Sequence, residues 1–593
     1  MSVCTAHADG SRPRLPRVGT RAATAALATL LLVGGSANAA LAIAPQSATP
    51  ACAPCTYHVT PTGSGTQSLA YVLQHLVQSN DTVVLANGVY RVGNLQVSAP
   101  DVTIIAEHVP ALGAQPTVWL DGSIPYHWWN HPSSRVWEHA YSRDFCNTTT
   151  PQLPCSKVAA PYHSDQIFVH GLAIPETVHP SDLNSVFPFF YADRVHHQLL
   201  TNIDPGNDTE VTDLETALVF NRSAAHSALE GIGVRYYAGN DHNPADLAMH
   251  QNAAVFVNDA TGVAFRNDMF SFNAVRGLKT QGDVPAAQTP VAGADVFIDG
   301  STFDHNGELG LNSNDSDGIV VQRSLFYRNA IKGYPGYGEA SGAKLLSTYG
   351  AHIVGDVFRA NLGMGLWFDR SSYDATVAHN LFQENTWDGF KYEVSAHATV
   401  TGNFAVSNDR SGLLVYESSQ VSLSHNYLRG NLIGIEIHEE RRTLANTPSA
   451  HDSDHDRHMP PDITFDVKDI DIHANGFYYA PSNPTWARCN PSSTVQFTLD
   501  GCEYDVAVED DLAQRDASAL DITTADDNFH TEDWPSNPLT APVPVFIAMW
   551  QARPAHASGG GCVFGATNSR ELRWTMLSNF RCTGQEHGAA TPP

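Results

Sequence analysis

Two neighbouring segments of the chain decide its fold: Gly365-Leu366-Trp367-Phe368-Asp369 and Ala375-Thr376-Val377-Ala378-His379-Asn380. In both segments every second side chain is apolar, which is typical of β-strands with one buried face. The second segment closes on an asparagine, a residue that tolerates tight turns and can bond to neighbouring backbone. Similar pairs of segments recur along residues 229–475. The sequence therefore predicts a structure built from repeated short strands.

The length of the repeat can be measured from a column of asparagines. Successive members lie 23 or 24 residues apart in four intervals, and 32 or 33 apart in the two intervals where a repeat is enlarged. A period in this range indicates a solenoid, in which each repeat forms one coil and stacks on the next. The column consists of Asn273, Asn306, Asn329, Asn361, Asn385, Asn408 and Asn431.

Further columns predict the interior of the coils. Each repeat has an apolar strand residue three positions before a turn, and five repeats carry a phenylalanine shortly after that turn. Stacked coil on coil, such side chains form continuous ladders in the core. The apolar column consists of Phe265, Ile298, Val321, Ile353, Val377, Val400, Leu423 and Ile472. The aromatic column consists of Phe270, Phe303, Phe326, Phe358 and Phe382, followed by Ala405 and Leu428.

A second strand in each repeat begins at a glycine. The residues one and three positions after it are mostly apolar and are expected to point inward, so those two and four positions after it point outward. The glycines are Gly277, Gly310, Gly342, Gly365, Gly389, Gly412 and Gly434.

These segments resemble the repeats of right-handed parallel β-helix proteins in the pectate-lyase-like superfamily. The resemblance implies an all-β fold, namely a single-stranded right-handed parallel β-helix solenoid. An N-terminal cap, a β-rich insertion and a disulfide-bearing C-terminal capping region are expected to complete it. The resemblance leaves the activity open, because this fold hosts lyases, hydrolases, epimerases and adhesins. A leucine-rich repeat is the alternative solenoid, but it needs a different spacing of leucine and asparagine.

Five regions are expected along the chain. The first carries a basic leader, an apolar run too short to span a bilayer and small residues at a cleavage site, which predicts a signal peptide; a membrane anchor is the alternative. The regions are the signal peptide at 1–42, an N-terminal cap and first coil at 43–123, the insertion at 124–225, the β-helix repeats at 226–478 and the capping region at 479–593.

The charge balance limits the class of partner. With 61 acidic residues against 33 Lys and Arg, the formal net charge is −28. Nucleic acids and anionic membranes attract basic surfaces, so neither is expected as a partner. We expect a monomer that is secreted, extracellular or at the cell surface, that has no membrane contact after cleavage, and that takes a polysaccharide as substrate or ligand.

Cysteine usage agrees with export. Once Cys4 leaves with the signal peptide, eight cysteines remain in four close pairs. Such pairs predict local disulfides in an oxidising compartment. For the first pair a zinc site is the alternative, although no second CxxC motif accompanies it. The predicted disulfides are Cys52/Cys55, Cys146/Cys155, Cys489/Cys502 and Cys562/Cys582.

Lysine is rare in this chain, and its distribution is uneven. Three of the six lysines, Lys279, Lys344 and Lys391, occupy the outward column two positions after the glycine. Strands of adjacent coils lie ~4.8 Å apart, so members of one column are neighbours. Binding groups gather on concave faces of rigid scaffolds, which favours a functional site over a merely solvated face. The enlarged coils at 281–293 and 330–341 would wall a groove there.

Asp369 and Glu393 form the best candidate pair of carboxylates, on adjacent coils and flanked by Lys391 and Arg370. Three uses stay open. The pair can be the acid and nucleophile of a retaining glycosidase, which needs a separation of about 5–5.5 Å. It can hold Ca²⁺ through carboxylate oxygens, or it can be an inert network of surface ion pairs. The candidate calcium ligands are Asp315, Asp317, Asp369 and Glu393.

The leading hypothesis is a polysaccharide lyase that cleaves a uronic-acid polymer by β-elimination. That reaction needs a base for the proton α to the carboxyl group and a cation that neutralises the carboxylate. A glycoside hydrolase, a polymer epimerase and a non-catalytic glycan-binding protein are the alternatives. The candidate catalytic residues are Lys344, Asp369, Arg370, Lys391 and Glu393. The candidate substrate-binding residues are Lys279, Asn312, Asn314, Tyr334, Tyr337, Trp367 and Tyr416.

Overall fold

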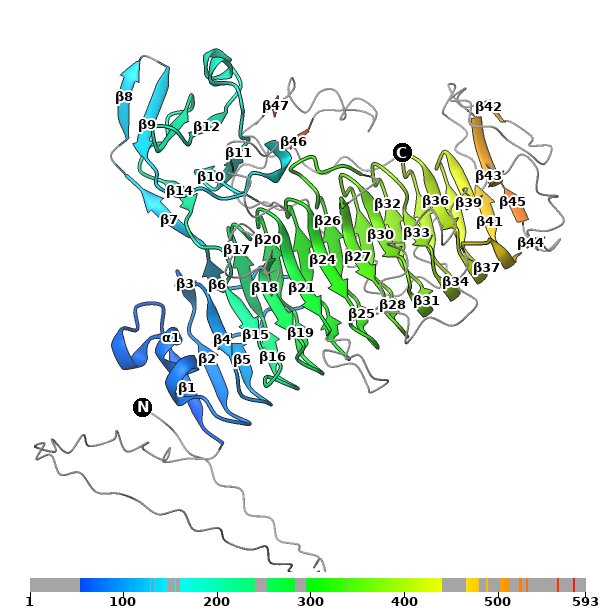
Figure 1. Cartoon of the computed structure of the whole chain (residues 1–593), viewed down its shortest axis with the longest axis horizontal. Helices are drawn as coiled ribbons and strands as arrows, with labels where there is room; N and C mark the ends of the chain where they lie inside the picture. The colour runs from blue at the N-terminus through cyan, green and yellow to red at the C-terminus, as the bar shows by residue number, and fades with distance from the viewer. Residues whose placement is uncertain are drawn as a thin grey trace, which may run out of the picture.

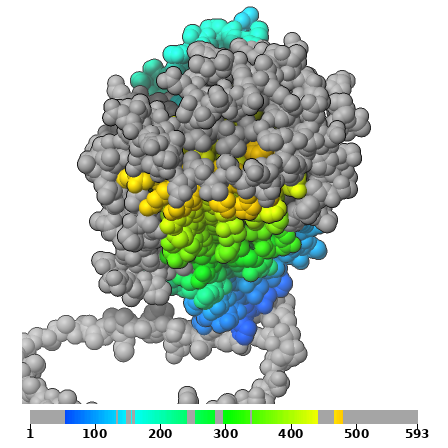
Figure 2. Space-filling view, turned by 90° about the vertical axis from the view of Figure 1, so that its right-hand side faces the viewer, coloured from blue at the N-terminus to red at the C-terminus, as the bar shows by residue number. Residues whose placement is uncertain are grey.

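The chain winds into a long tube of stacked coils (Figure 1). The computed structural model describes residues 54–439 except 128, 134, 147–154, 156–159, 240–252, 283–294 and 337–338, then residues 465–478 and short strands beyond them. Each complete coil adds one strand to each of three parallel sheets, here called A, B and C. The predicted all-β parallel β-helix is therefore confirmed. Figure 2 shows successive coils as parallel bands of colour.

Sheet A carries the apolar column expected from the sequence. Its register pairs Phe265 with Ile298, Ile298 with Val321, and so on to Leu423 with Ile472, and these residues lie in the main core. The strands are β1 Thr56–Val59, β2 Thr82–Leu85, β5 Thr103–Ala106, β16 Ala228–Glu230, β19 Ala264–Arg266, β22 Phe297–Asp299, β25 Val320–Gln322, β28 His352–Val354, β31 Tyr373–Ala378, β34 Ala396–Thr401, β37 Ser419–Ser424, β40 Lys468–His473 and β44 Ile522–Thr524.

Sheet B carries the phenylalanine stack. The ring centroids of Phe270, Phe303, Phe326 and Phe358 follow one another at 4.8, 4.7 and 4.6 Å, with nearly parallel planes. The strands are β3 Gly88–Tyr90, β6 Val118–Asp121, β17 Ile232–Arg235, β20 Met269–Ser271, β23 Thr302–Asp304, β26 Leu325–Tyr327, β29 Val357–Arg359, β32 Leu381–Gln383, β35 Phe404–Val406, β38 Tyr427–Arg429, β41 Gly476–Tyr478 and β45 Phe529–Thr531.

Sheet C contains the strands that begin near the glycine column. Residues one and three positions after each glycine, such as Leu366 and Phe368, lie in the core, as predicted. The strands are β4 Leu95–Val97, β15 Leu218–Phe220, β18 Ala253–Asn258, β21 Arg276–Gln281, β24 Leu309–Asn314, β27 Ser341–Leu346, β30 Met364–Asp369, β33 Phe390–Glu393, β36 Ser411–Tyr416, β39 Ile433–Glu439, β43 Cys502–Asp510 and β42 Ala487–Arg488.

The asparagine column forms a hydrogen-bonded ladder between sheets B and C. The Oδ1 atom of Asn361 accepts hydrogen bonds from the backbone N and Nδ2 of Asn329, at 3.0 and 3.1 Å. Its Nδ2 donates to Asn385 Oδ1 at 2.9 Å and to the Phe326 carbonyl at 3.1 Å. A buried amide that is fully paired costs little, whereas an unpaired one is expensive. The ladder therefore satisfies the turn of each coil with the side chain of the next.

The glycine column is explained by close packing between coils. A β-carbon at Gly365 would lie 2.3 Å from the Gly389 carbonyl oxygen and 3.0 Å from the Nδ2 of Asn385. A side chain there would push the asparagine ladder apart. Glycine is required because backbone and ladder approach this position too closely.

The N-terminal end of the tube is closed by a short helical cap. The cap consists of η1 Gly65–Gln67, α1 Leu69–Tyr71 and η2 Val72–Leu76. Leu69, Val72 and Leu73 are buried in the main core. The cap thus covers apolar side chains that an open solenoid end would expose.

A β-rich insertion interrupts the first coils, as predicted. It forms two four-stranded antiparallel sheets and its own small core. One sheet contains β7 Ser123–Tyr126, β10 Ile167–Val169, β11 Leu172–Ile174 and β14 Thr209–Thr212, and the other β8 Asn130–Ser133, β9 Val136–Ala140, β12 Phe190–Asp193 and β13 Gln198–Thr201. Its short helices are η4 Ala160–Tyr162 and η5 Pro180–Asn184. The following strand β15 pairs with β4 in sheet C, so the expected border at residue 225 lies inside a coil.

One predicted disulfide can be checked in full. Cys146 and Cys155 are bonded within the insertion, which confirms that prediction. Cys489, Cys562 and Cys582 lie outside the described residues, as does the side chain of Cys502. The two C-terminal pairings stay predictions, as do the signal peptide at 1–42 and the capping role of residues 479–593. A short antiparallel pair, β46 Val563–Phe564 and β47 Phe580–Arg581, is described in that region.

The first cysteine pair is described only in part. Cys55 is buried, and its backbone N donates a 2.6 Å hydrogen bond to Asp81 Oδ1. Its sulfur is disulfide-bonded, which favours a disulfide over the zinc site considered for this pair. Cys52, however, lies outside the described residues. The predicted pairing of Cys55 with Cys52 is therefore not confirmed and stays a prediction.

Candidate functional site

The outward column on sheet C is continuous. The strand register pairs Lys279 with Asn312, Asn312 with Lys344, Lys344 with Trp367 and Trp367 with Lys391. The column therefore brings together lysines that are far apart in sequence, as the repeat period predicted.

These outward side chains are buried rather than exposed on an open groove wall. Lys344, Trp367 and Lys391 are only 4, 3 and 8 % exposed. A buried ammonium group needs a partner, because removing a charge from water costs several kcal/mol. The site must therefore be understood through its internal ion pairs.

Each of the two central lysines pairs with one of the two predicted carboxylates. Lys344 Nζ lies 3.0 Å from Asp369 Oδ2, on the next coil. Lys391 Nζ lies 2.7 Å from Glu393 Oε2, on its own strand. The hydroxyl of Ser395 donates to the Glu393 carbonyl at 2.7 Å and so holds the end of β33. The structure thus brings together four of the five predicted catalytic residues as two ion pairs.

Trp367 joins the two ion pairs. Lys344 Nζ lies 3.8 Å from the centre of its ring, and its indole Nε1 donates a 3.0 Å hydrogen bond to Glu393 Oε2. Cation–π contact and a charge-assisted hydrogen bond both gain strength away from water. Trp367, predicted to bind substrate, therefore fixes the orientation of Glu393 and contacts Lys344.

The charges around Asp369 favour its ionised form. Burial by itself raises the pKa of Asp369, but Lys344, and more weakly Lys391 and Arg370, lower that pKa below its usual range. Asp369 is also the most exposed member of the two pairs, with 20 % of its side chain accessible. Of these four groups, it is the one that a ligand reaches most directly.

Other predicted binding residues lie along the same face. Asn312 Nδ2 donates to Asn314 Oδ1 at 3.1 Å, and Asn314 Nδ2 donates to Gln281 at 3.3 Å. Tyr416 lies beneath Lys391, with Nζ 4.2 Å from its ring centre. This polar strip covers coils on both sides of the central pairs.

Tyr334 lies elsewhere. It is 3 % exposed and packs edge-on against Tyr162 of the insertion, with ring centroids 4.9 Å apart. The loop that was expected to wall a groove instead docks on the insertion through this tyrosine. Tyr337 lies outside the described residues.

The candidate calcium ligands do not converge. Asp315 Oδ2 accepts a hydrogen bond from Gln281, and Asp317 Oδ1 accepts one from the Tyr349 backbone, while Asp369 and Glu393 face lysines. In the described parts of the chain, no three His, Cys, Asp or Glu side chains are grouped as metal ligands. No step is therefore derived through a metal at these residues, and calcium stays an untested prediction.

Sequence analysis missed a buried acid at the N-terminal side of the strip. Glu308 Oε2 lies 2.8 Å from Arg276 Nε, and Arg276 also approaches Glu339, which in turn lies 4.0 Å from Lys344. Burial raises the pKa of Glu308 to about 7, with a further increase from Glu339, although Arg276 opposes it. The available signal in the sequence was the acid Glu308 itself, because the neighbouring repeats have Val275 and Ala340 at this position.

A second pair of acids was missed at the C-terminal side. Asp388 Oδ1 accepts a 3.0 Å hydrogen bond from the backbone of Ser411, whose hydroxyl donates to Glu436. Burial raises the pKa of Asp388, and Glu436 raises it further against the effect of Arg410. Despite burial, hydrogen bonding from His438 and the charge of Arg410 lower the pKa of Glu436. One acid of this pair is thus biased towards the neutral form and the other towards the charged form.

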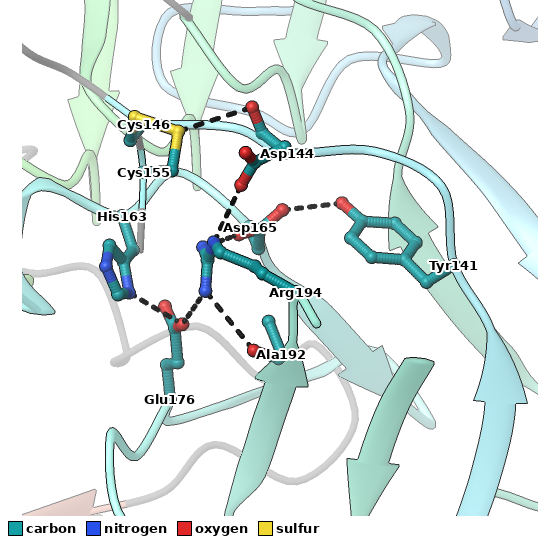
Figure 3. Close-up of a disulfide and its surroundings, with 9 residues drawn as sticks. All are labelled: Tyr141, Asp144, Cys146, Cys155, His163, Asp165, Glu176, Ala192 and Arg194. Carbon is teal, nitrogen blue, oxygen red and sulfur yellow. Dashed lines mark hydrogen bonds and ion pairs between the residues drawn. A yellow bond between two sulfur atoms is a disulfide. The ribbon is translucent and has the colours of Figure 1, made fainter. Parts of the chain in front are cut away.

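A separate charge cluster lies in the insertion (Figure 3). Arg194 contacts Asp165, Glu176 and Asp144, and His163 Nδ1 lies 2.8 Å from Glu176. Lys332 of the solenoid loop reaches this cluster and donates to the carbonyls of His163 and Asp165, at 2.5 and 3.1 Å. Burial raises the pKa of Asp165 to about 6 although Arg194 lowers it. This cluster fixes the insertion against the loop that carries Glu339.

The comparisons with known proteins define the class. A family model described as right handed beta helix region matches residues 249–433. The chain is a right-handed parallel β-helix protein, as the sequence repeats predicted. No curated protein matches it. In the described residues no helix is both long and apolar enough to cross a membrane.

Solved structures with the same fold include three sugar-related proteins. XylC in complex with xylose is 15% identical, with 81% of this chain and 86% of that chain covered and a TM-score of 0.56. The periplasmic alginate epimerase AlgG is 11% identical, with 77% and 85% covered and a TM-score of 0.30. A lacto-N-biosidase from Eubacterium ramulus is 10% identical, with 77% and 67% covered and a TM-score of 0.39. At these identities the similarity shows the fold alone.

Proposed function

We propose that this chain is an exported, carbohydrate-active enzyme that cleaves glycosidic bonds at the Asp369–Glu393 pair on sheet C. The observation that carries the proposal is the arrangement of the pair: two carboxylates on adjacent coils, each held by its own lysine and linked through Trp367. Because adjacent coils are ~4.8 Å apart, carboxylates on neighbouring coils can approach the separation of about 5–5.5 Å that retaining glycosidases use.

We assign the two carboxylates different roles in this reaction. Asp369 has its pKa lowered, so it is ionised and can attack the anomeric carbon. Glu393 is assigned the acid/base role by its position, because Trp367 and Lys391 hold its Oε2 on the coil next to that of Asp369. A retaining hydrolase needs this division between nucleophile and acid/base. The fold relationship to a xylose-bound protein is consistent with a sugar ligand.

A polysaccharide lyase is the second candidate. The lysine column favours it, because Lys279, Lys344 and Lys391 lie on one face and could neutralise a uronate carboxylate. In a lyase, however, one lysine or arginine must also act as a base. Lys344 and Lys391 are each within 3.0 Å of a carboxylate, an arrangement that suits them to holding these acids in place. We therefore prefer the hydrolase.

The test separates these reactions by their products. The full-length mature protein is incubated with neutral and uronic-acid polysaccharides. New reducing ends without unsaturated uronide absorbance support hydrolysis, whereas absorbance that disappears in Lys344→Met and Lys391→Met indicates the lyase. Glu393→Gln is expected to lower kcat/KM about 10²–10⁴-fold, the contribution of a general acid/base.

A matched control makes the same chemical change elsewhere. Glu384→Gln alters an exposed carboxylate that pairs with Arg359 on the outside of sheet B, and it is expected to leave the rate unchanged. Full activity in Glu393→Gln and Asp369→Asn would contradict the proposed site. Binding of glycan with neither product would make the chain a glycan-binding protein instead.

A further inference from the structure

A second surface with features of a sugar site lies on the outside of sheet A, over strands β31, β34, β37 and β40. The structure has an open pocket there, separate from the strip on sheet C. Most of the side chains that line it are polar and can donate or accept hydrogen bonds. The lining includes Asp374, His397, Thr399, Ser422, Asp469 and Asp471.

An aromatic ladder runs into this pocket along three successive coils. The rings of Tyr349 and Tyr373 are stacked, with centroids 5.3 Å apart and planes inclined by 17°. The next ring, His397, has its centroid 4.4 Å from Tyr373 and lines the pocket. Tyr349 is 40 % exposed. A tyrosine that is accessible in this way offers a flat apolar surface with a polar edge.

The pocket groups are set out in regular columns. The register of sheet A aligns Thr376, Thr399 and Ser422 with Asp471 on successive coils. The residue two positions before each of these has a positive φ, with values of 55–58°. That position is occupied by Asp374, His397, Gln420 and Asp469. The surface therefore repeats hydrogen-bonding groups at the spacing of the coils, beside the aromatic ladder.

We propose that this face of sheet A is a non-catalytic binding site for a neutral oligosaccharide. The exposed ring of Tyr349 would contact the apolar face of a sugar ring, and the edges of the Tyr373 and His397 rings would continue this surface. Sugar hydroxyls would donate to the carboxylates of Asp374 and Asp471 and exchange hydrogen bonds with Thr399 and Ser422. Sugar sites commonly combine apolar contact with a few placed polar groups, and hydrogen bonds to carboxylates are stronger than those between neutral groups.

The charge of the surface selects the class of glycan. Asp374, Asp469 and Asp471 all line the pocket, so a chain of uronic acids would bring like charges together at a cost. His397 lies 3.9 Å from Asp374 and His473 lies 3.0 Å from Asp471, and these histidines share the acids with the ligand. A neutral glycan avoids repulsion and still uses the carboxylates as acceptors. This proposal does not depend on the reaction at sheet C.

The experiment measures binding without turnover. Glu393→Gln protein is titrated calorimetrically with neutral hexasaccharides of xylose, glucose and mannose, with oligogalacturonate, and with chitosan hexasaccharide. At least one neutral hexasaccharide is expected to bind. The double variant Tyr349→Ala, Tyr373→Ala in the same background is expected to bind it at least about tenfold more weakly, whereas Tyr373→Phe, which keeps the ring, is expected to retain binding.

Two controls separate this site from the rest of the molecule. Tyr427→Ala removes a partly buried tyrosine that stacks on Phe404 at sheet B, 4.9 Å between centroids, and should leave binding unchanged. Circular dichroism confirms that each variant is folded. Absence of binding by every neutral glycan, binding by only the charged ones, or binding unaffected by the double substitution would each overturn the proposal. None of these results bears on whether Glu393 is catalytic.

Discussion

The inside of the solenoid and the outward face of sheet C follow opposite rules. Inside, each coil repeats its neighbour: Phe303, Phe326 and Phe358 stack at nearly constant spacing, and the asparagines form hydrogen bonds in the same way from coil to coil. Outside, successive coils carry different residue types in the outward column of sheet C, where Lys344 is followed by Trp367 and then by Lys391. Between these two regions, repetition marks the residues that build the fold, and its interruption marks the residues of sheet C to test for function.

The two regions also differ in how they satisfy buried polar groups. The ladders use neutral amides, each paired on both sides. The strip on sheet C uses ion pairs, which cost more to bury and are seldom the most stable solution. A chain that keeps buried charges where neutral ladders are available sacrifices stability at that face, which is common at functional sites.

The largest effect is expected from breaking the repeating interior. Phe326→Ala removes a fully buried ring that stacks on both neighbours at 4.7 and 4.6 Å. We expect the free energy of unfolding to fall by about 3–5 kcal/mol, from lost burial and the cavity. Urea unfolding followed by fluorescence measures it. Phe326→Leu, which fills most of the space, should cost less, and a loss below about 1 kcal/mol in the alanine variant would contradict the packing.

A smaller loss is expected from breaking an ion pair of the strip. Lys344→Met leaves the Asp369 carboxylate without its 3.0 Å partner. The expected cost is about 2–4 kcal/mol, somewhat below that of a fully buried pair because Asp369 is partly accessible. The double variant Lys344→Met, Asp369→Leu should recover most of this stability while lacking activity. If the double variant is less stable than either single variant, the pair contributes to stability through packing and not through charge.

The repeat was predictable because parallel strands in register convert sequence period into spatial neighbourhood. The positions of Phe303, Phe326 and Lys344 in their columns follow from counting residues, and so does the placement of Asp369 and Glu393 at the ends of β30 and β33 on adjacent coils. No knowledge of long-range contacts was needed, since each coil touches only the next.

The features that the sequence did not predict depend on contacts that do not repeat from coil to coil. Tyr334 packs on Tyr162 because a loop meets the insertion, whose strands are far away in sequence. The raised pKa values of Glu308 and Asp388 come mainly from lost hydration and could be recognised only when their burial was known, although an acid in an otherwise apolar position already distinguished Glu308. Burial of the outward column likewise cannot be read from alternation, which distinguishes faces but not what covers them.

A stabilising substitution is expected at Asp356, an acidic residue in a buried ladder of otherwise neutral neighbours. A second ladder, at the turn between sheets A and B, runs from Ser324 through Asp356 to Asn380. The Oδ1 atom of Asp356 accepts a hydrogen bond from the Ser324 backbone at 2.6 Å, but its buried Oδ2 has no hydrogen-bond partner in the structure. Burial raises the pKa of Asp356 well above its usual value. Asp356→Asn should add a donor, as Asn380 has towards Asn403 and Ile353, and stabilise the fold by about 1–3 kcal/mol at pH 7.

The sign of the pH dependence checks this mechanism. The folded chain retains the proton of Asp356, whereas the unfolded chain releases it above an ordinary pKa of about 3.9. The aspartate therefore lowers stability increasingly as the pH rises above about 4. The gain from Asp356→Asn should be larger at pH 7 than at pH 4, measured by urea unfolding at both. Asn380→Asp is the matched reverse change and should destabilise, most at pH 7; an equal gain at both pH values would contradict the raised pKa.

The smallest effect is expected from an ion pair outside the strip. Arg359 Nε lies 3.2 Å from Glu384 Oε2 on the outside of sheet B, where both side chains are over a third exposed. Water and salt screen such a pair, so Arg359→Ala should change the unfolding free energy by less than about 1 kcal/mol. Thermal unfolding at low and high salt measures it beside Lys344→Met. If the two variants cost the same, burial would not distinguish the strip on sheet C from an ordinary charged surface, and the argument that its ion pairs are kept for function would lose its basis.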